Sequence, residues 1–341
     1  MTTPIEIDGS EGEGGGQILR SSLALSVITG TPVLFRNIRA KRSKPGLRRQ
    51  HLAAVRAAGA ISGAELRGDA VSSMELSFAP GVVVPGQHDV SIGTAGSTTL
   101  VLQTLLWPLL LADAPSEVVI EGGTHNPMAP TFEFLERTFF PQVRRMGVQA
   151  ELTLEKHGFY PAGGGRLRAS LRPSDLSPCS WETRGKAQSV DARALVSGLP
   201  VNIAQREIGT AIAALGWERN QGKAVRVESP GPGNALLLGA TFESGTTVVS
   251  SIGSKGKRAE DVATQAAEEM QKFLASTAPI DEHLADQLLL PMALAKGGSF
   301  VTGKPSLHTR TNADVIARFL PVRTTFTERD DGTWRIQVDA D

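Results

Sequence analysis

Apolar residues recur at helical spacing soon after the N-terminus. Leu19, Leu23 and Val27 occupy positions i, i+4 and i+8, which is the spacing of one face of a helix. The short apolar run at 5–7 before them predicts a strand, and the glycine-rich loop at 12–16 connects the two. The chain therefore begins with a strand, a glycine loop and a helix.

Two later segments repeat parts of this arrangement. A glycine-containing loop at 93–97 leads into an almost wholly apolar helix at 98–111, and a third apolar run begins just after Gln287. Each of the three helices carries one amide in an apolar context, namely Gln17, Gln103 or Gln287. A buried amide must be hydrogen-bonded or face a polar cleft. The pattern predicts a repeated βα unit whose helices start at one common site.

The middle of the chain has a different pattern and lies between two turn-rich seams. The predicted elements are a strand at 192–196, a helix at 204–214, strands at 235–240 and 246–252, and a helix at 259–274. This βαββα pattern fits a compact domain of about 95 residues. Because the third amide-bearing helix follows the second seam, we expect an inserted domain at 184–276 and a larger domain formed by 1–183 and 277–341.

Composition places the chain among ordinary globular proteins but conceals an uneven charge distribution. Its 341 residues include 35 Lys+Arg and 35 Asp+Glu, and 40% are hydrophobic. A single cysteine, Cys179, excludes an internal disulfide and a Cys-based zinc site. No acidic residue occurs from Gly14 to Ala64, whereas this span holds nine positive charges: Arg20, Arg36, Arg39, Lys41, Arg42, Lys44, Arg48, Arg49 and Arg56. Such a basic block favours a polyanionic partner, although a solvated surface loop would have the same composition.

The glycine loop at 12–16 suits an anion. A strand, a glycine loop and a helix together present backbone N–H groups and a positive helix end. The loop is not a dinucleotide fingerprint, because Gln17 stands where the third glycine would be, and no G-x-x-x-x-G-K-[ST] loop occurs in the chain. Two interpretations stay open: the loop binds phosphates by another route, or its glycines only permit a tight turn.

Two residues are candidates for chemistry. Glu13 is the acid within the glycine loop; it could hold a divalent cation beside phosphates or simply stabilise the helix start. His308 lies among hydroxyls, an amide and the cations Lys304 and Arg310, with no carboxylate before Asp314. A neutral imidazole is a nucleophile toward phosphorus, and nearby cations discourage its protonation. The alternative is a hydrogen-bonded loop histidine. The six histidines show no chelating spacing, which argues against a histidine metal site.

Five short blocks, in order along the chain, resemble the motifs of RNA 3'-terminal phosphate cyclases. The blocks are EGEGGGQILR at 11–20, KPGLRRQH at 44–51, GGTHNP at 122–127, HGFYPAGGGRL at 157–167 and HLADQLLLPM at 283–292. The resemblance runs from about residue 5 to residue 323. It implies an α/β (α+β) fold in which three βαβαββ-type units form a large domain and a smaller thioredoxin-like α/β domain is inserted.

The resemblance also implies an activity. Enzymes of this family use ATP and a divalent metal, Mg²⁺ or Mn²⁺, to convert an RNA 3'-phosphate into a 2',3'-cyclic phosphate. A histidine at the position of His308 attacks the ATP α-phosphate and forms a histidine–AMP intermediate with release of pyrophosphate. AMP then passes to the RNA 3'-phosphate, and the 2'-hydroxyl closes the ring and releases AMP.

Individual residues match functional positions of the family. By this resemblance Glu13 binds the metal; Gln103, His283, Leu284, Ala285, Asp286 and Gln287 contact ATP; Pro130 packs on adenine; and Gln17, Arg20, Arg42 and Gln50 handle phosphates or the RNA end. His283 departs from the family pattern, because relatives often have an aromatic residue there. An imidazole can also stack on a base.

The expected partner is an RNA with a 3'-terminal phosphate. The longest apolar stretch, at 100–112, is interrupted and too short to span a bilayer, so we expect no membrane contact. No secretory signal is evident at the N-terminus, and we expect a cytoplasmic protein with no obligate protein partner. The alternatives are a non-catalytic relative that binds RNA and a non-nucleotide transferase, such as an enolpyruvyl transferase. His308 and Glu13 favour the enzyme over both.

Overall fold

The N-terminal part of the chain folds into a four-stranded sheet with two helices. The structure is a computed structural model that describes residues 3–341. The elements of this first unit are β1 (Ile5–Asp8), α1 (Gly16–Thr29), β2 (Val33–Arg36), α2 (Arg49–Ser62), β3 (Glu65–Arg67) and β4 (Leu76–Ala79). The strand order is β1-β2-β4-β3, with β1 parallel to β2 and the other pairs antiparallel. The predicted strand at 5–7 and the predicted helix after the glycine loop are confirmed.

Two further four-stranded sheets follow the same plan. The second comprises β5 (Gln87–Ser91), α3 (Thr98–Leu110), β6 (Ser116–Gly122), α4 (Phe132–Phe134), a π-helical turn η1 (Leu135–Phe139), α5 (Phe140–Arg145), β7 (Gln149–Lys156) and β8 (Gly165–Arg172). The third comprises β9 (Ser180–Trp181), α8 (Glu282–Leu294), β14 (Gly297–Thr302), α9 (Leu307–Ala317), β15 (Val322–Glu328) and β16 (Trp334–Ala340).

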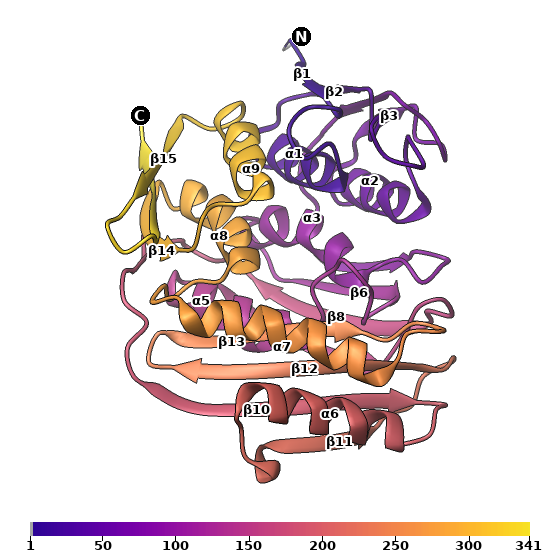
Figure 1. Cartoon of the computed structure of the whole chain (residues 1–341). Helices are drawn as coiled ribbons and strands as arrows, with labels where there is room; N and C mark the ends of the chain where they lie inside the picture. Colours follow the sequence, from indigo (N-terminus) through magenta and orange to yellow (C-terminus); the bar gives the residue numbers. More distant parts are fainter. Residues whose placement is uncertain (1–2) are drawn as a thin grey trace.

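The three sheets share one strand topology. Their orders are β1-β2-β4-β3, β5-β6-β8-β7 and β9-β14-β16-β15. In each sheet the first pair is parallel and the remaining pairs are antiparallel. The mixed α/β fold class is therefore confirmed, and Figure 1 shows the helices of these units meeting at the centre of the molecule.

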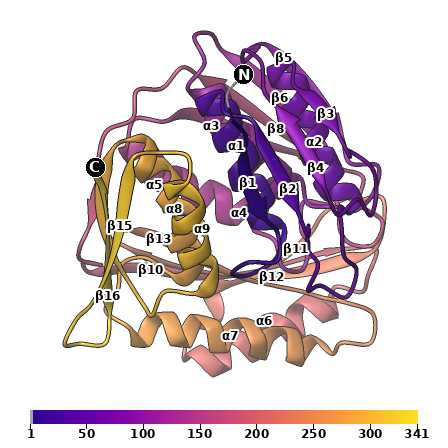
Figure 2. The same cartoon turned by 90° about the horizontal axis from the view of Figure 1, so that it is seen from above.

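A fourth sheet lies in the chain between β9 and α8. It comprises β10 (Ala187–Ser197), α6 (Asn202–Leu215), a 3₁₀ turn η2 (Arg219–Gln221), β11 (Gly222–Arg226), β12 (Gly233–Phe242), β13 (Gly245–Ile252) and α7 (Ala259–Ala275). Helices α6 and α7 pack together on one face of this sheet (Figure 2). The predicted βαββα pattern was incomplete, because β11 adds a strand that pairs in parallel with β10. The domain boundaries at 183/184 and 276/277 stay a prediction.

The core explains why the central helices carry so few polar residues. Helices α1, α3 and α8 are buried along most of their length, and Leu23, Val101 and Leu288 are fully buried. A helix that is apolar on nearly all sides is stable only inside a protein or a membrane. Within residues 3–341, no helix is both long and apolar enough to cross a membrane. Some of the polar side chains on these helices, such as Gln17 and Ser22, are therefore buried and need partners.

Candidate functional site

The glycine loop is held against α9 and α2 by close contacts that require glycine. A Cβ built on Gly12 would lie 2.2 Å from Oγ1 of Thr311, and one built on Gly16 would lie 2.5 Å from Nε2 of His51. The main-chain N–H of Glu13 donates to Oγ1 of Thr311 at 3.1 Å. The loop thus carries Glu13 to the surface of α9, close to His308.

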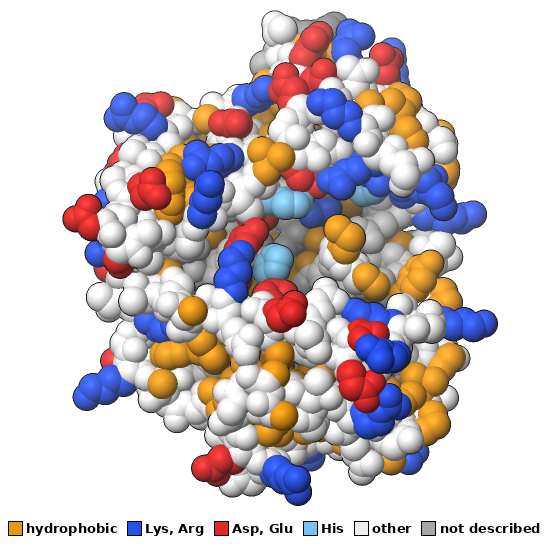
Figure 3. Space-filling view, in the orientation of Figure 1, with side chains coloured by type: hydrophobic (Ala, Val, Ile, Leu, Met, Phe, Trp, Pro, Cys, Tyr) orange, Lys and Arg blue, Asp and Glu red, His pale blue; other side chains and the backbone are white. Residues whose placement is uncertain are grey.

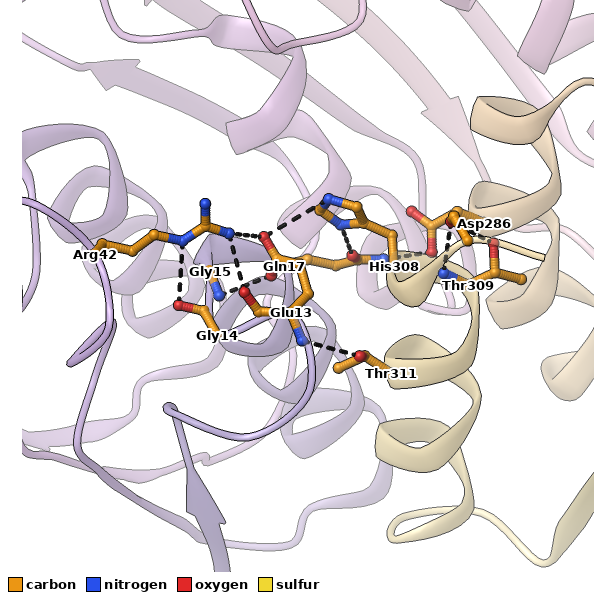
Figure 4. Close-up of polar contacts among 10 residues, drawn as sticks. Glu13, Gly14, Gly15, Gln17, Arg42, Asp286, His308, Thr309 and Thr311 are labelled. Carbon is orange, nitrogen blue, oxygen red and sulfur yellow. Dashed lines mark hydrogen bonds and ion pairs between the residues drawn. The ribbon is translucent and has the colours of Figure 1, made fainter. Parts of the chain in front are cut away.

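The carboxylate of Glu13 is nearly enclosed. Its side chain is only 9% exposed, and Oε2 accepts a 2.7 Å hydrogen bond from the N–H of Gly15. Arg42 forms an ion pair with Oε1 and also donates to the main-chain oxygen of Glu13 at 3.0 Å. Nε2 of His308 lies 3.7 Å from the same Oε1. Figure 4 shows Glu13 between the guanidinium and the imidazole. The residues that flank His308 in the sequence do not indicate a carboxylate beside its ring.

His308 is the second residue of α9, and its ring is anchored by α1. Ser306 caps this helix, because its Oγ accepts the N–H of Thr309 at 3.2 Å. Nδ1 of His308 lies 2.7 Å from Oε1 of Gln17 (Figure 4). The expectation that Arg310 surrounds His308 was wrong: its guanidinium packs over Phe326, 4.7 Å from the ring centroid, and over Trp334. Residues two positions apart on a helix do not share a face, which explains the difference.

A pocket beside His308 brings together residues from four helices. Its polar lining is Gln17, Arg20, Ser21, Gln103, Asp286, Gln287 and Asn312. Nε2 of Gln103 donates to Oε1 of Gln287 at 2.9 Å, and Gln17 contacts Asp286. The structure thus confirms that the three amide-bearing helices converge on one place.

Arg20 gives the pocket a partly buried positive charge. Its Nε is buried and has no hydrogen-bond partner among the described residues. Burial lowers the pKa of Arg20 to about 10, an effect opposed by Asp286 and Glu13, so the guanidinium remains charged at neutral pH. A buried donor without a partner is costly, and an anion in the pocket would satisfy it.

Other predicted residues lie outside this lining. The side chains of Leu284 and Ala285 are packed in the core, so only their backbone could contact a ligand. Oε1 of Gln50 accepts the N–H of Ser97 at 2.7 Å, which ties α2 to the second glycine loop. The main-chain oxygen of Pro130 accepts from Oγ1 of Thr99 at 2.7 Å.

His283 lies one helical turn before Gln287 and is largely exposed. Its Nε2 lies 3.1 Å from Oε1 of Glu269, which belongs to α7. This contact, supported by Asp281, raises the pKa of His283 to about 9. Nε2 of Gln287 also donates to the main-chain oxygen of His283 at 3.4 Å. The imidazole is therefore protonated at neutral pH, in the first turn of the helix that also supplies Asp286.

His51 is a residue that the sequence interpretation did not assign to the site. Its Nδ1 accepts the N–H of Arg48 at 3.1 Å. Burial, together with Arg39, Arg20 and Arg48, lowers the pKa of His51 to about 3, so its imidazole is neutral. The sequence feature that could have pointed to His51 is its position in the acid-free span, directly after Gln50. Figure 3 shows basic and histidine side chains gathered around the hollow of this face.

The site suits the two expected ligands, the phosphates of ATP and a divalent metal, to different degrees. Arg20 and the N–H groups at the start of α1, which has no side-chain cap, suit phosphate oxygens. Within residues 3–341, no group of three or more His, Cys, Asp or Glu side chains could hold a metal. Mg²⁺ in phosphate sites is often held by one or two carboxylates together with phosphate oxygens and water. Glu13 therefore fits a metal that arrives with phosphates, and this metal would compete with Arg42 for the carboxylate.

Known proteins resemble this chain along almost its whole length. The family model of RNA 3'-terminal phosphate cyclases matches residues 11–326. The chain belongs to this cyclase family. A protein from Ectopseudomonas mendocina named RNA 3'-terminal phosphate cyclase is 50% identical over 335 residues, covering 98% of each chain. Cyclases so named from Koribacter versatilis and Ralstonia nicotianae are each 48% identical, covering 96% and 98% of this chain and 92% and 97% of their own.

The similarity to a solved structure is weaker. An enolpyruvyl transferase from Streptomyces tendae aligns with a TM-score of 0.37 and 12% identity, over 98% of this chain and 48% of that chain. Such a low score supports no inference. The match to the cyclase family along nearly the whole chain confirms the resemblance seen in the sequence motifs and disfavours the enolpyruvyl transferase alternative.

Proposed function

We propose that this protein uses ATP to convert an RNA 3'-terminal phosphate into a 2',3'-cyclic phosphate. The observation that carries the proposal is the position of His308. Its Nε2 lies 3.7 Å from Glu13, at a pocket whose Arg20 has a buried Nε without a partner among residues 3–341. The names of the relatives, each about 50% identical, support the same reaction. We propose further that it acts in the cytoplasm, with 184–276 as an inserted domain, and needs no protein partner.

In the first step His308 attacks the α-phosphate of ATP. A bond forms between Nε2 and phosphorus, the bond to the bridging oxygen breaks, and pyrophosphate leaves with the bonding electrons. Arg20 and the N–H groups at the start of α1 stabilise the negative charge on the phosphates. A divalent cation on Glu13, Mg²⁺ or Mn²⁺, would offset the charge of the leaving pyrophosphate. Gln103, Asp286 and Gln287 bind the nucleoside from the pocket wall.

In the later steps the RNA end replaces pyrophosphate at the site. An oxygen of the RNA 3'-phosphate attacks the AMP phosphorus, and the bond to His308 breaks. The 2'-oxygen then attacks the activated 3'-phosphate, and AMP leaves. This activation replaces a poor leaving group with a good one. Arg42 and Gln50 lie within the acid-free span and would hold the RNA end by its phosphate rather than by its bases.

The decisive experiment follows label from α-labelled ATP. Wild-type protein with Mg²⁺ or Mn²⁺ is expected to retain acid-labile label after denaturing electrophoresis, and His308→Ala is expected to retain none. His88→Ala serves as the matched control, because this half-buried histidine lies outside the pocket and contacts the main chain at Val84. A 3'-phosphorylated oligoribonucleotide should then gain a cyclic end. Absence of label on the wild type would overturn the proposal and favour an RNA-binding relative without catalysis. Equal label on His308→Ala would overturn it as well, because the nucleotide would then be attached to another residue.

A further inference from the structure

Gln17 connects the proposed nucleophile to a buried carboxylate. Its Oε1 lies 2.7 Å from Nδ1 of His308, and its Nε2 donates to Oδ1 of Asp286. Gln17 itself is only 8% exposed. Three helices that are distant in sequence, α1, α8 and α9, are thus joined through a single amide (Figure 4).

The orientation of this amide is fixed by its partners. Burial raises the pKa of Asp286, but the hydrogen bond from Gln17 and the charge of Arg20 oppose this shift and favour a carboxylate that accepts. The NH₂ group of Gln17 therefore donates to Asp286 and its oxygen faces His308. Neighbouring hydrogen bonds also hold α1, α8 and α9 together around this amide. Nδ2 of Asn312 donates to the main-chain oxygen of Asp286 at 3.0 Å, and Oγ of Ser21 donates to Oδ1 of Asn312 at 2.7 Å. The amide cannot turn over without losing the bond to Asp286.

The orientation of the amide determines the tautomer of His308. An amide oxygen only accepts, so Nδ1 of His308 must carry the proton. The lone pair of the neutral ring is then on Nε2. This atom faces Glu13 at 3.7 Å, which is too long for a hydrogen bond, so the lone pair is free.

We propose that Gln17 is a positioning residue that holds His308 as the Nδ1–H tautomer and stabilises the charge its ring gains on attack. The inference rests on the proposed function and replaces the expected phosphate-binding role of Gln17. When Nε2 bonds to the α-phosphorus and pyrophosphate departs, the ring becomes an imidazolium that keeps its Nδ1 proton. The amide oxygen holds that proton without removing it, and the charge of Asp286 increases the polarity of the amide.

The first test reads the tautomer in the free protein. In the ¹⁵N NMR spectrum of histidine-labelled wild type, His308 is expected to show a protonated Nδ1 and an unprotonated Nε2 in its neutral form. Gln17→Met removes both hydrogen bonds at similar side-chain length and is expected to give a mixture of tautomers. Gln103→Met alters another amide of the same pocket and is expected to keep the wild-type tautomer. A wild-type tautomer in Gln17→Met would overturn the proposal.

The second test measures adenylation at saturating ATP. Gln17→Met is expected to lower the single-turnover rate about 10- to 100-fold, the usual cost of losing an orienting partner of a functional histidine. The KM for ATP should change little, because the lost contact acts on His308 and not on the nucleotide. Gln271→Met, on the far helix α7, is expected to change neither value. A lowered affinity for ATP at an unchanged rate would instead identify Gln17 as a phosphate ligand and overturn the proposal.

A second variant keeps the proposal testable should Gln17→Met not fold. Asp286→Asn lets the facing amide either donate or accept, so Gln17 can turn over and His308 is expected to become a tautomer mixture. An unchanged tautomer in this variant would overturn the orienting role of Asp286 and with it the proposal. The NMR measurements need no ATP, so a wild type that shows the Nδ1–H tautomer but never becomes labelled would reject the proposed function alone.

Discussion

Nε2 of His308 and Oε1 of Glu13 lie 3.7 Å apart, although the two residues belong to opposite ends of the chain. A carboxylate this close to an attacking atom would repel the phosphates of a nucleotide unless its charge were offset. Arg42 offsets that charge in this structure, since it pairs with the same carboxylate oxygen. The three residues together define the phosphate side of the candidate site.

We expect Glu13→Gln to impair adenylation and to weaken its dependence on metal concentration. The variant keeps the size of the side chain but loses the charge that a cation requires, so a loss of about 100-fold is expected. Titration of labelling against Mg²⁺ and Mn²⁺ measures the effect. Glu11→Gln, an exposed neighbour paired with Arg318, is the control and should behave as wild type. An unchanged metal dependence in Glu13→Gln would reject Glu13 as the metal ligand.

Arg42→Ala is expected to slow cyclisation more than self-adenylation. A cation on Glu13 would compete with the guanidinium for the carboxylate, and a released guanidinium would be available to the RNA phosphate. Rates are compared by labelling the protein with ATP and, separately, by adding RNA to protein that is already adenylated. Arg36→Ala, at an exposed arginine paired with Glu6 and Glu75, is the control. Equal losses in both steps would contradict this division of roles.

Gly16→Ala should destabilise the fold through its contact with His51. The added Cβ would lie 2.5 Å from Nε2 of His51 and 3.1 Å from Nη1 of Arg20. Overpacking of this kind costs about 1–3 kcal/mol in the free energy of unfolding. Urea unfolding should show that His51→Ala reduces this cost. Gly209→Ala is the control, because no atom beyond its chain neighbours and the backbone of its own helix lies within 4 Å of its built Cβ, and alanine favours a helix. A cost that is unchanged by His51→Ala would contradict the prediction.

The pair of His283 and Glu269 should make stability depend on pH. The pKa of His283 is raised from 6.5, the value of an unperturbed histidine, to about 9 in the folded protein. The contribution of the pair to the free energy of unfolding is therefore fully present below pH 6.5 and is lost as the pH rises through 9. Because the pair is exposed, we expect about 0.2–1 kcal/mol. Urea unfolding of wild type and Glu269→Gln should differ at about pH 6 and agree at about pH 10. Glu268→Gln is the control. A difference that grows with pH would refute the assignment.

Periodicity predicted the elements of the fold better than it predicted the contacts of the site. The apolar spacing located α1 and α3, and the single amides in apolar runs correctly pointed to one meeting place. The strand β11 was missed because its residues are only partly buried and alternate weakly. The contact of Glu13 with His308, the direction of Arg310 and the burial of His51 depend on how separate elements pack. Spacing within a segment carries no information about such contacts.

The strand topology of the third sheet has a consequence for how the protein is made. Strand β9 pairs with β14 only after the chain has passed through the whole fourth sheet. The glycine loop likewise can contact Thr311 only after α9 has been synthesised. Pairings between such distant segments form slowly, and domains tend to fold as they leave the ribosome. A nascent chain therefore carries Glu13 and Arg42 long before it carries His308. The nucleophile joins the site late in synthesis, so incomplete chains are expected to be unable to react with nucleotide.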